Sequence, residues 1–181
     1  MILLLKLIQE RFDIMTNIDA SVLQPSELKN LMTGKTRLIG LDVGERRVGI
    51  SVSDTAWSIA SPVEVWDMKQ QPLQHFKKIL DVYNLQWRQP IVGFVVGLPL
   101  SLYGEIGPQA EKVQKFCDRV LKPLGYPIAY WDERMSTHGA GRALTEADMS
   151  RKQKSEVIDK MAAVFILQGV LDFLKMMSNH E

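Results

Sequence analysis

The sequence predicts an α/β fold in which helices flank a mixed five-stranded central sheet. Residues 37–43 and 47–54 read as two strands with only three residues between them, so they form an antiparallel hairpin. Further along the chain, helical patterns alternate with apolar strands up to residue 133, which is typical of strands joined through helices. A sheet that contains both kinds of pairing, with helices on its faces, accounts for these two observations.

Each strand is predicted from its own residue pattern. Residues 37–43 are a short apolar run that ends at a glycine, and residues 47–54 alternate apolar and polar side chains with period two. Residues 59–66 and 128–133 are predicted as the third and fifth strands. The fourth strand, residues 91–98, is a continuous apolar run, as expected for a strand that is covered on both faces.

The helices are predicted from apolar side chains that recur every three or four residues. Pro108 stands at the first position of one helix, and Gly125 and Pro127 follow its last turn, which is the usual chemistry of helix starts and stops. Four helices are expected on this basis, over residues 72–83, 108–124, 136–144 and 156–177.

Residues 1–36 are expected to form an N-terminal extension, and residues 37–181 the compact domain. Helical apolar spacing predicts a short amphipathic helix in residues 1–15, and the mixed polar composition of residues 16–36 predicts a linker or a loosely packed arm. The apolar start is shorter than the roughly 20 residues of a membrane span and lacks the charge order of a signal peptide. We therefore expect a cytoplasmic protein that does not bind membranes, with no catalytic role for the extension.

Composition and charge indicate a globular domain and limit the metals it could hold. The 181 residues are 46% hydrophobic and 24% charged, and the net charge of +1 lacks the overall basicity that announces nucleic-acid binding. A local basic face would suffice for such binding. The single cysteine, Cys117, lies on an apolar helix face and is expected in the core, and no Cys/His cluster has zinc spacing. Any metal would be held by oxygen ligands, which suit magnesium, manganese or calcium.

Three acids are candidates for chemistry, and each also has a simpler interpretation. Asp42 lies within an apolar strand, where an unpaired acid is rare, although it would also serve to cap the next turn. Glu133 ends the fifth strand, where functional groups often gather, although Arg134 beside it would form an ordinary surface ion pair. Asp159 lies early in the last helix, where the helix dipole favours acids in any case.

The three acids gain weight if the fold brings them together. Two alanines, Ala162 and Ala163, share the helix face of Asp159 and would let that helix approach the sheet closely. Three neighbouring carboxylates cannot all stay ionised without a cation. Two divalent ions about 3.5–4 Å apart would neutralise them and hold both oxygens of an in-line phosphoryl displacement. The pattern is typical of a nuclease.

Basic side chains near these acids are candidates for binding the phosphates of a substrate, although a solvated helix surface would look similar. The segment 97–108 joins a strand to a helix. It is either a long surface loop or a source of backbone N–H groups for a phosphate at the helix start. The candidate substrate-binding residues are Arg46, Arg47, Arg134, Arg151, Lys152, Lys154 and Lys160.

Several motifs stand in order along the chain: Gly40-Leu-Asp-Val-Gly with Arg47-Val-Gly-Ile-Ser-Val-Ser-Asp, Val96-Gly-Leu-Pro-Leu, Gly104-Glu-Ile-Gly-Pro, Trp131-Asp-Glu-Arg-Met-Ser-Thr and Val157-Ile-Asp-Lys-Met-Ala-Ala. This series resembles the YqgF family, also called RuvX, of pre-16S rRNA nucleases that were earlier described as Holliday junction resolvases. The resemblance runs from about Arg37 to about Leu174, over nearly all of the predicted domain.

The resemblance implies an RNase H-like fold and a part in maturing the 5′ end of 16S rRNA. It implies that Asp42, Glu133 and Asp159 are the catalytic residues and the ligands of Mg²⁺ or Mn²⁺. Precursor rRNA and the pre-ribosomal particle are the implied partners. The chain departs from the family where Ser101-Leu102-Tyr103 replaces an Asn or Asp with a further polar residue, and at His138-Gly-Ala-Gly. These departures concern substrate contacts more than metal ligation.

Three alternatives remain beside this interpretation. The first is a Holliday junction resolvase acting on branched DNA, which normally needs a symmetric dimer. The second is a non-catalytic RNA-binding factor in ribosome assembly that uses the same surface. The third is an actin-like ATPase, which also opens with a Gly-x-Asp-x-Gly turn but needs two such halves, whereas this chain has room for one.

Overall fold

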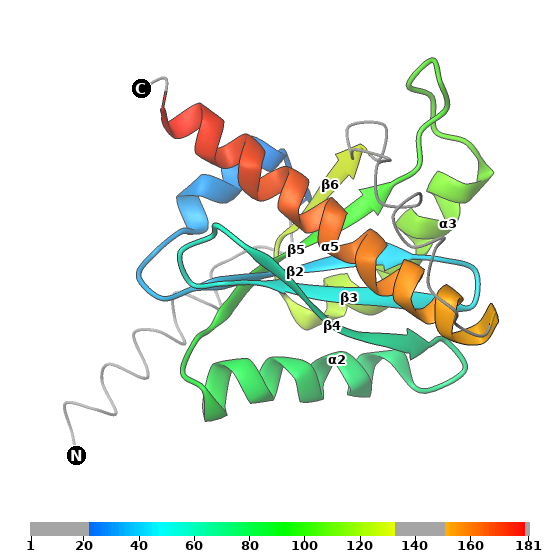
Figure 1. The fold of residues 1–181 in the computed structure, drawn as a ribbon, viewed down its shortest axis with the longest axis horizontal. Coiled ribbons are helices and arrows are strands. Elements are labelled where there is room, and N and C mark those ends of the chain that lie inside the picture. Colours follow the sequence, from blue (N-terminus) through cyan, green and yellow to red (C-terminus); the bar gives the residue numbers. More distant parts are fainter. Residues whose placement is uncertain (1–21, 133–150, 180–181) are drawn as a thin grey trace.

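A mixed six-stranded sheet forms the centre of the computed structural model, which describes residues 22–132 and 151–179 (Figure 1). The strands are β1 (Val22–Leu23), β2 (Arg37–Val43), β3 (Arg47–Ser53), β4 (Ala60–Asp67), β5 (Ile91–Leu98) and β6 (Ile128–Asp132). Their order across the sheet is β1-β6-β5-β2-β3-β4. The β2–β3 and β3–β4 pairs are antiparallel, and the other three pairs are parallel. The predicted mixed sheet is confirmed.

Helices cover both faces of the sheet. On one face lie α2 (Pro72–Asp81) with a π-helical turn η2 (Val82–Gln86), and α3 (Pro108–Phe116) with the turns η3 (Cys117–Leu121) and η4 (Lys122–Leu124). The other face carries the long helix α5 (Arg151–Ser178) and the 3-10 helix η1 (Pro25–Leu31) (Figure 1). The predicted helix stop at Gly125 is confirmed, since this glycine adopts φ +77° after η4.

The period-two alternation of β2 divides the core into two layers. Ile39 and Leu41 are fully buried among the side chains of α2 and α3, and Leu38 is fully buried on the opposite face, among those of α5 and η1. Successive side chains of a strand point to opposite faces, so the positions of Gly40 and Asp42 belong to the α5 face with Leu38.

The packed part of the chain begins before Arg37, so the expectation of a linker or loosely packed arm is corrected for residues 22–36. Val22 and Leu23 pair with Ile128 and Ala129 of β6 and add the sixth strand. Leu28 of η1 is fully buried in the α5-side core. A two-residue strand has no pattern of its own, so composition alone could not reveal it. The helices expected over residues 1–15 and 136–144 lie outside the described residues.

Within the described residues, one helical segment, Lys160–Ser178 of α5, is long and apolar enough to cross a membrane by length and composition. In this fold its apolar face packs on the sheet: the buried side chains are Ala163, Ile166, Leu167, Val170, Leu171 and Leu174. The apolar composition of α5 is therefore explained by its packing in the core of the domain.

Candidate active site

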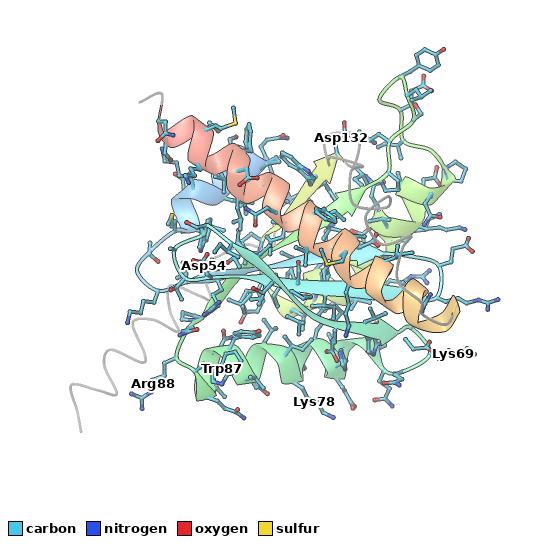
Figure 2. All side chains as sticks on the ribbon, viewed as in Figure 1. Asp54, Lys69, Lys78, Trp87, Arg88 and Asp132 are labelled. Atoms are coloured by element: carbon cyan, nitrogen blue, oxygen red, sulfur yellow. The ribbon has the colours of Figure 1, made fainter. Side chains whose placement is uncertain are left out.

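The three parallel strands β2, β5 and β6 end at one edge of the sheet, which we call the carboxyl edge. Leu41 pairs with Val96, Val96 pairs with Tyr130, and Leu98 pairs with Asp132, the last residue of β6. Figure 2 labels Asp132 at this end of β6. Asp42 follows Leu41 and so lies near the same edge. In open sheets with helices, reactive groups often gather beyond the carboxyl ends of the strands.

Asp42 stands between two glycines on the neighbouring strands. Gly49 of β3 is its cross-strand partner, and Gly97 of β5 follows Val96, the partner of Leu41. Neither position carries a side chain, so the two strands beside Asp42 present only backbone at this level of the sheet. Asp42 is itself half-buried. A half-buried carboxylate flanked by glycines at the carboxyl ends of the strands suits a ligand of a cation or of a polar substrate.

Helix α5 approaches the sheet closely at Gly40. A Cβ atom on Gly40 would lie 2.6 Å from the Leu167 Cβ and 3.1 Å from the Ala163 carbonyl oxygen, so only glycine fits beneath the helix. The Ser51 hydroxyl donates a hydrogen bond to the same carbonyl at 2.8 Å. The predicted close approach of the alanine-bearing face is confirmed at Ala163, which is fully buried.

These contacts place residue 159 of α5 relative to Asp42. The Ala60 amide donates to the Gln168 side chain at 2.9 Å, so α5 runs toward the amino-terminal end of β2 as its residue numbers rise. Residue 159 is one turn before Ala163, about 6 Å back along the helix axis. Asp42 is two residues beyond Gly40, about 6.6 Å along the strand in the same direction. The backbone of residue 159 therefore lies at about the same level as Asp42 along the direction of β2.

The remaining candidate residues divide between described and undescribed parts of the chain. Glu133 and Arg134 follow β6 directly and lie outside the described residues. Within the described side chains, no group of three His, Cys, Asp or Glu could hold a metal ion. The side chains of Arg151, Lys152, Lys154 and Asp159 are likewise outside the described part, although their backbone begins α5.

The β2–β3 turn carries two of the described basic candidates and is fixed to helix α3, whereas a third, Lys160, is half-buried in α5. Arg46 in the turn is exposed, and Arg47 is half-buried as β3 begins. Glu45 in the same turn forms an ion pair with Lys112 of α3, at 2.8 Å between carboxylate oxygen and ammonium nitrogen. Lys112 lowers the pKa of Glu45 by this hydrogen bond and by its charge. Sequence analysis did not identify this pair, because 67 residues separate its members.

The loop between β5 and α3, residues 99–107, is closed near its base. Leu100 and Ile106 form an isolated antiparallel bridge. The Ser101 amide donates to the Glu105 carbonyl at 3.0 Å, and the Ser101 hydroxyl accepts from the Glu105 amide at 3.0 Å. The β5–α3 loop is thus a hairpin-like projection, which agrees with the surface-loop alternative.

Cys117 is confirmed as a core residue. It is fully buried, and burial raises the pKa of its thiol to about 12. A thiol with such a pKa is not ionised near neutral pH and cannot act as a nucleophile there. Cys117 is therefore not a candidate nucleophile.

The sequence model of the RuvX family, described as a Holliday junction resolvase, matches residues 36–173 of the chain. This chain belongs to the RuvX family. The predicted family is confirmed, and RuvX membership together with the observed strand order confirms the RNase H-like fold. The sheet has six strands rather than the predicted five, because β1 was not expected.

Curated RuvX relatives match most of the chain. A protein of Paramagnetospirillum magneticum named "Putative pre-16S rRNA nuclease" is 40% identical over 151 residues, which are 83% of this chain and 95% of the relative. A protein of Desulfitobacterium hafniense with the same name is 41% identical over 139 residues, 77% of this chain and 94% of the relative. These names and the family description share one activity class, the hydrolysis of phosphodiester bonds, which is the predicted class.

Among solved structures, Thermus thermophilus RuvC in complex with a Holliday junction substrate aligns over 78% of this chain and 96% of its own. The sequence identity is 15% and the TM-score is 0.44. A likeness at this level is too distant to indicate a shared substrate.

Proposed function

We propose that this protein is a divalent-metal-dependent endonuclease that processes the 5′ end of precursor 16S rRNA. One observation carries the site: Asp42 stands between two glycines at the carboxyl edge, level with the backbone of residue 159. The substrate follows from the names of the RuvX relatives, which this chain matches at about 40% identity over most of its length.

The proposed metal ligands are the carboxylates of Asp42, Glu133 and Asp159. The donor set fits Mg²⁺ or Mn²⁺, because all three ligands are oxygen donors and Asp42 lies at the carboxyl edge between glycines of both neighbouring strands. When bound, such ions activate a water molecule and stabilise the charge that develops on the phosphate. The carboxylates themselves position the cations and balance their charge at the edge of an apolar core.

The proposed phosphate-binding residues are close to these acids in the sequence. Arg46 and Arg47 follow Asp42 in the β2–β3 turn, and the ion pair between Glu45 and Lys112 holds this turn against α3. Arg134 follows Glu133 in the sequence. Arg151, Lys152, Lys154 and Lys160 belong to the early turns of α5, which begins at the same end of the sheet (Figure 1). Their charges would neutralise substrate phosphates on either side of the cleaved bond.

Precursor rRNA, alone or within a pre-ribosomal particle, is the proposed partner, and the cytoplasm is the proposed location. The family's description as a Holliday junction resolvase favours a second candidate activity, the resolution of such junctions. The two activities share the proposed acids and differ in substrate. A symmetric pair of active sites would be needed only for the junction, since two strands must be cut there.

One assay separates these candidates. The purified full-length protein is incubated with precursor 16S rRNA or with a four-way DNA junction, in Mg²⁺, in Mn²⁺ and with a chelator. We expect metal-dependent cleavage of the RNA that is lost in Asp42→Asn. Cleavage of the junction alone would support the resolvase. Tight RNA binding without cleavage under any metal would contradict the proposal and favour a non-catalytic assembly factor.

A further inference from the structure

The tip of the β5–α3 loop presents two large apolar side chains to solvent. Leu102 is 90% exposed and Tyr103 is 91% exposed, the two highest values among the large hydrophobic side chains described as exposed. The loop projects away from the body of the molecule beside β6 and α3 (Figures 1 and 2). Tyrosine is enriched where proteins bind partners, so a tyrosine at the tip of a projection is a candidate binding residue.

The backbone holds this tip in a defined turn. The Gly104 amide donates to the Ser101 carbonyl at 2.9 Å, and Gly104 adopts φ +84°, which closes a four-residue turn with Leu102 and Tyr103 at its centre. The bridge between Leu100 and Ile106 holds the two arms below it. A tyrosine on such a turn has few torsions left to order, so binding through its ring costs little conformational entropy.

The base of the loop lies at the proposed catalytic edge. The loop begins after Leu98, which pairs with Asp132 at the end of β6. It ends at α3, whose Lys112 contacts Glu45, three residues after Asp42. Tyr103 is three residues beyond the bridge, so its backbone reaches at most about 10 Å farther out. A nucleic acid held at the carboxyl edge would pass close to this tip.

We propose that Tyr103 is a substrate-positioning residue that stacks on one unpaired base of the nucleic acid bound at this edge. The proposal rests on the proposed nuclease function and adds a contact outside the metal site. An aromatic face stacks on any unpaired base, whereas the bases of a duplex are already stacked on each other. A protein partner fits this tip less well, because two side chains offer far less than the roughly 800 Å² that each partner of a stable interface buries.

Equilibrium binding to short RNAs tests the proposal without any cleavage. The full-length protein is titrated, with a chelator present, into single-stranded RNAs that each carry 2-aminopurine at a different position. We expect one position whose fluorescence is quenched on binding by wild type and Tyr103→Phe but not by Tyr103→Ala. Tyr103→Ala should bind about tenfold more weakly, within the range that one stacked base supplies. An abasic site at that position should remove the difference between Tyr103→Ala and wild type.

Trp87→Ala is the matched control, because Trp87 is an exposed aromatic residue, 54% exposed, at the other end of the molecule (Figure 2). It should leave both affinity and quenching unchanged. Three results would overturn the proposal: equal binding by Tyr103→Ala and wild type, equal weakening on intact and abasic RNA, or a change of oligomeric state that accounts for the loss. If RNA is cleaved but Tyr103 has no effect, only this inference fails. If the stacking signature appears but no metal supports cleavage, only the proposed function fails.

Discussion

The Ser51 hydroxyl of β3 donates a hydrogen bond to the backbone carbonyl oxygen of Ala163 in α5, at 2.8 Å. Both residues are fully buried and cannot reach water, so this bond satisfies the hydroxyl and the carbonyl within the protein. It fixes the position of α5 along the sheet at the point where Gly40 admits the helix. The position of residue 159 relative to Asp42 along the strand therefore depends on a contact one helical turn away, at Ala163.

Gly40→Ala should displace α5 and weaken both stability and activity. The added methyl group would lie 2.4 Å from the Ser51 hydroxyl and 2.6 Å from the Leu167 Cβ, so the helix must shift. Overpacking of this kind costs about 1–3 kcal/mol in the free energy of unfolding, which urea denaturation measures. Gly107→Ala is the control, since a Cβ atom added there would meet nothing within 4 Å and its φ of −94° suits alanine. Equal stability of the two variants would contradict the close approach.

Asp42→Asn should abolish metal-dependent cleavage and leave the fold intact. Removing one charge from a group of carboxylates relieves repulsion, so the thermal stability of the metal-free protein should hold or rise. Circular dichroism melting with a chelator and cleavage with Mg²⁺ give the two readouts. Asp118→Asn is the control, because this exposed acid pairs only with Lys122 among its described ion-pair partners and surface pairs contribute little. Wild-type cleavage by Asp42→Asn would eliminate Asp42 as a ligand.

The combined Arg151→Ala, Lys152→Ala and Lys154→Ala variant should bind RNA more weakly and with a flatter dependence on salt. Each phosphate contact that is lost removes counterion release, about 0.7 unit of the logarithmic salt slope for a single strand. Affinity measured between low and moderate salt gives the slope. The matched control changes Lys77 and Lys78 of α2 and Lys122 of η4, which lie on the face of the sheet opposite α5. A slope equal to that of wild type would refute the contacts.

Residues 22–36 should be needed for stability, whereas residues 1–21 should not be needed for cleavage. A chain that starts at residue 37 loses β1 and the fully buried Leu28. Leu28→Ala alone should lower the free energy of unfolding by about 2–5 kcal/mol, the usual range for a buried leucine. Met32→Ala, at a position that is 46% exposed, should change it by less than about 0.5 kcal/mol. A fully stable chain starting at residue 37 would show that the sixth strand is dispensable.

Cys117 should resist thiol reagents until the protein unfolds. Its thiol titrates with a pKa of about 12 because burial disfavours the thiolate, so at pH 8 almost none is ionised. Because burial raises this pKa from 9.0 to about 12, the unfolded chain releases the proton first, so the free energy of unfolding is unaffected below pH 9 and falls as the pH rises from about 9 to about 12. A chromogenic disulfide reagent at pH 8 should show no reaction in buffer and one reactive thiol in denaturant. Rapid labelling of the native protein would contradict the buried position.

The sequence predicted what repeats along an element and missed what depends on contacts between elements. The apolar pattern of β2 located the strand and put Asp42 on a defined face, and the alanines of α5 indicated a helix that lies close to the sheet. The sequence could not predict β1, because a strand of two residues is too short to show a period-two alternation. The exposure of Tyr103 depends on a turn that is closed by Ser101 and Gly104. The sequence showed that this segment departs from the family motif, but it did not show the shape of the turn.

The hydrogen bond between Ser51 and Ala163 joins residues that are 112 positions apart in the chain. During synthesis the hairpin of β2 and β3 is complete long before α5 has been made. The α5 face of the sheet is therefore completed last, and until α5 is made the cluster that contains Leu38 and Val95 lacks the side chains of this helix. A nascent chain with this topology carries Asp42 without Asp159. An activity that needs both acids can begin only after nearly the whole domain has been translated, so incomplete chains would not cut RNA.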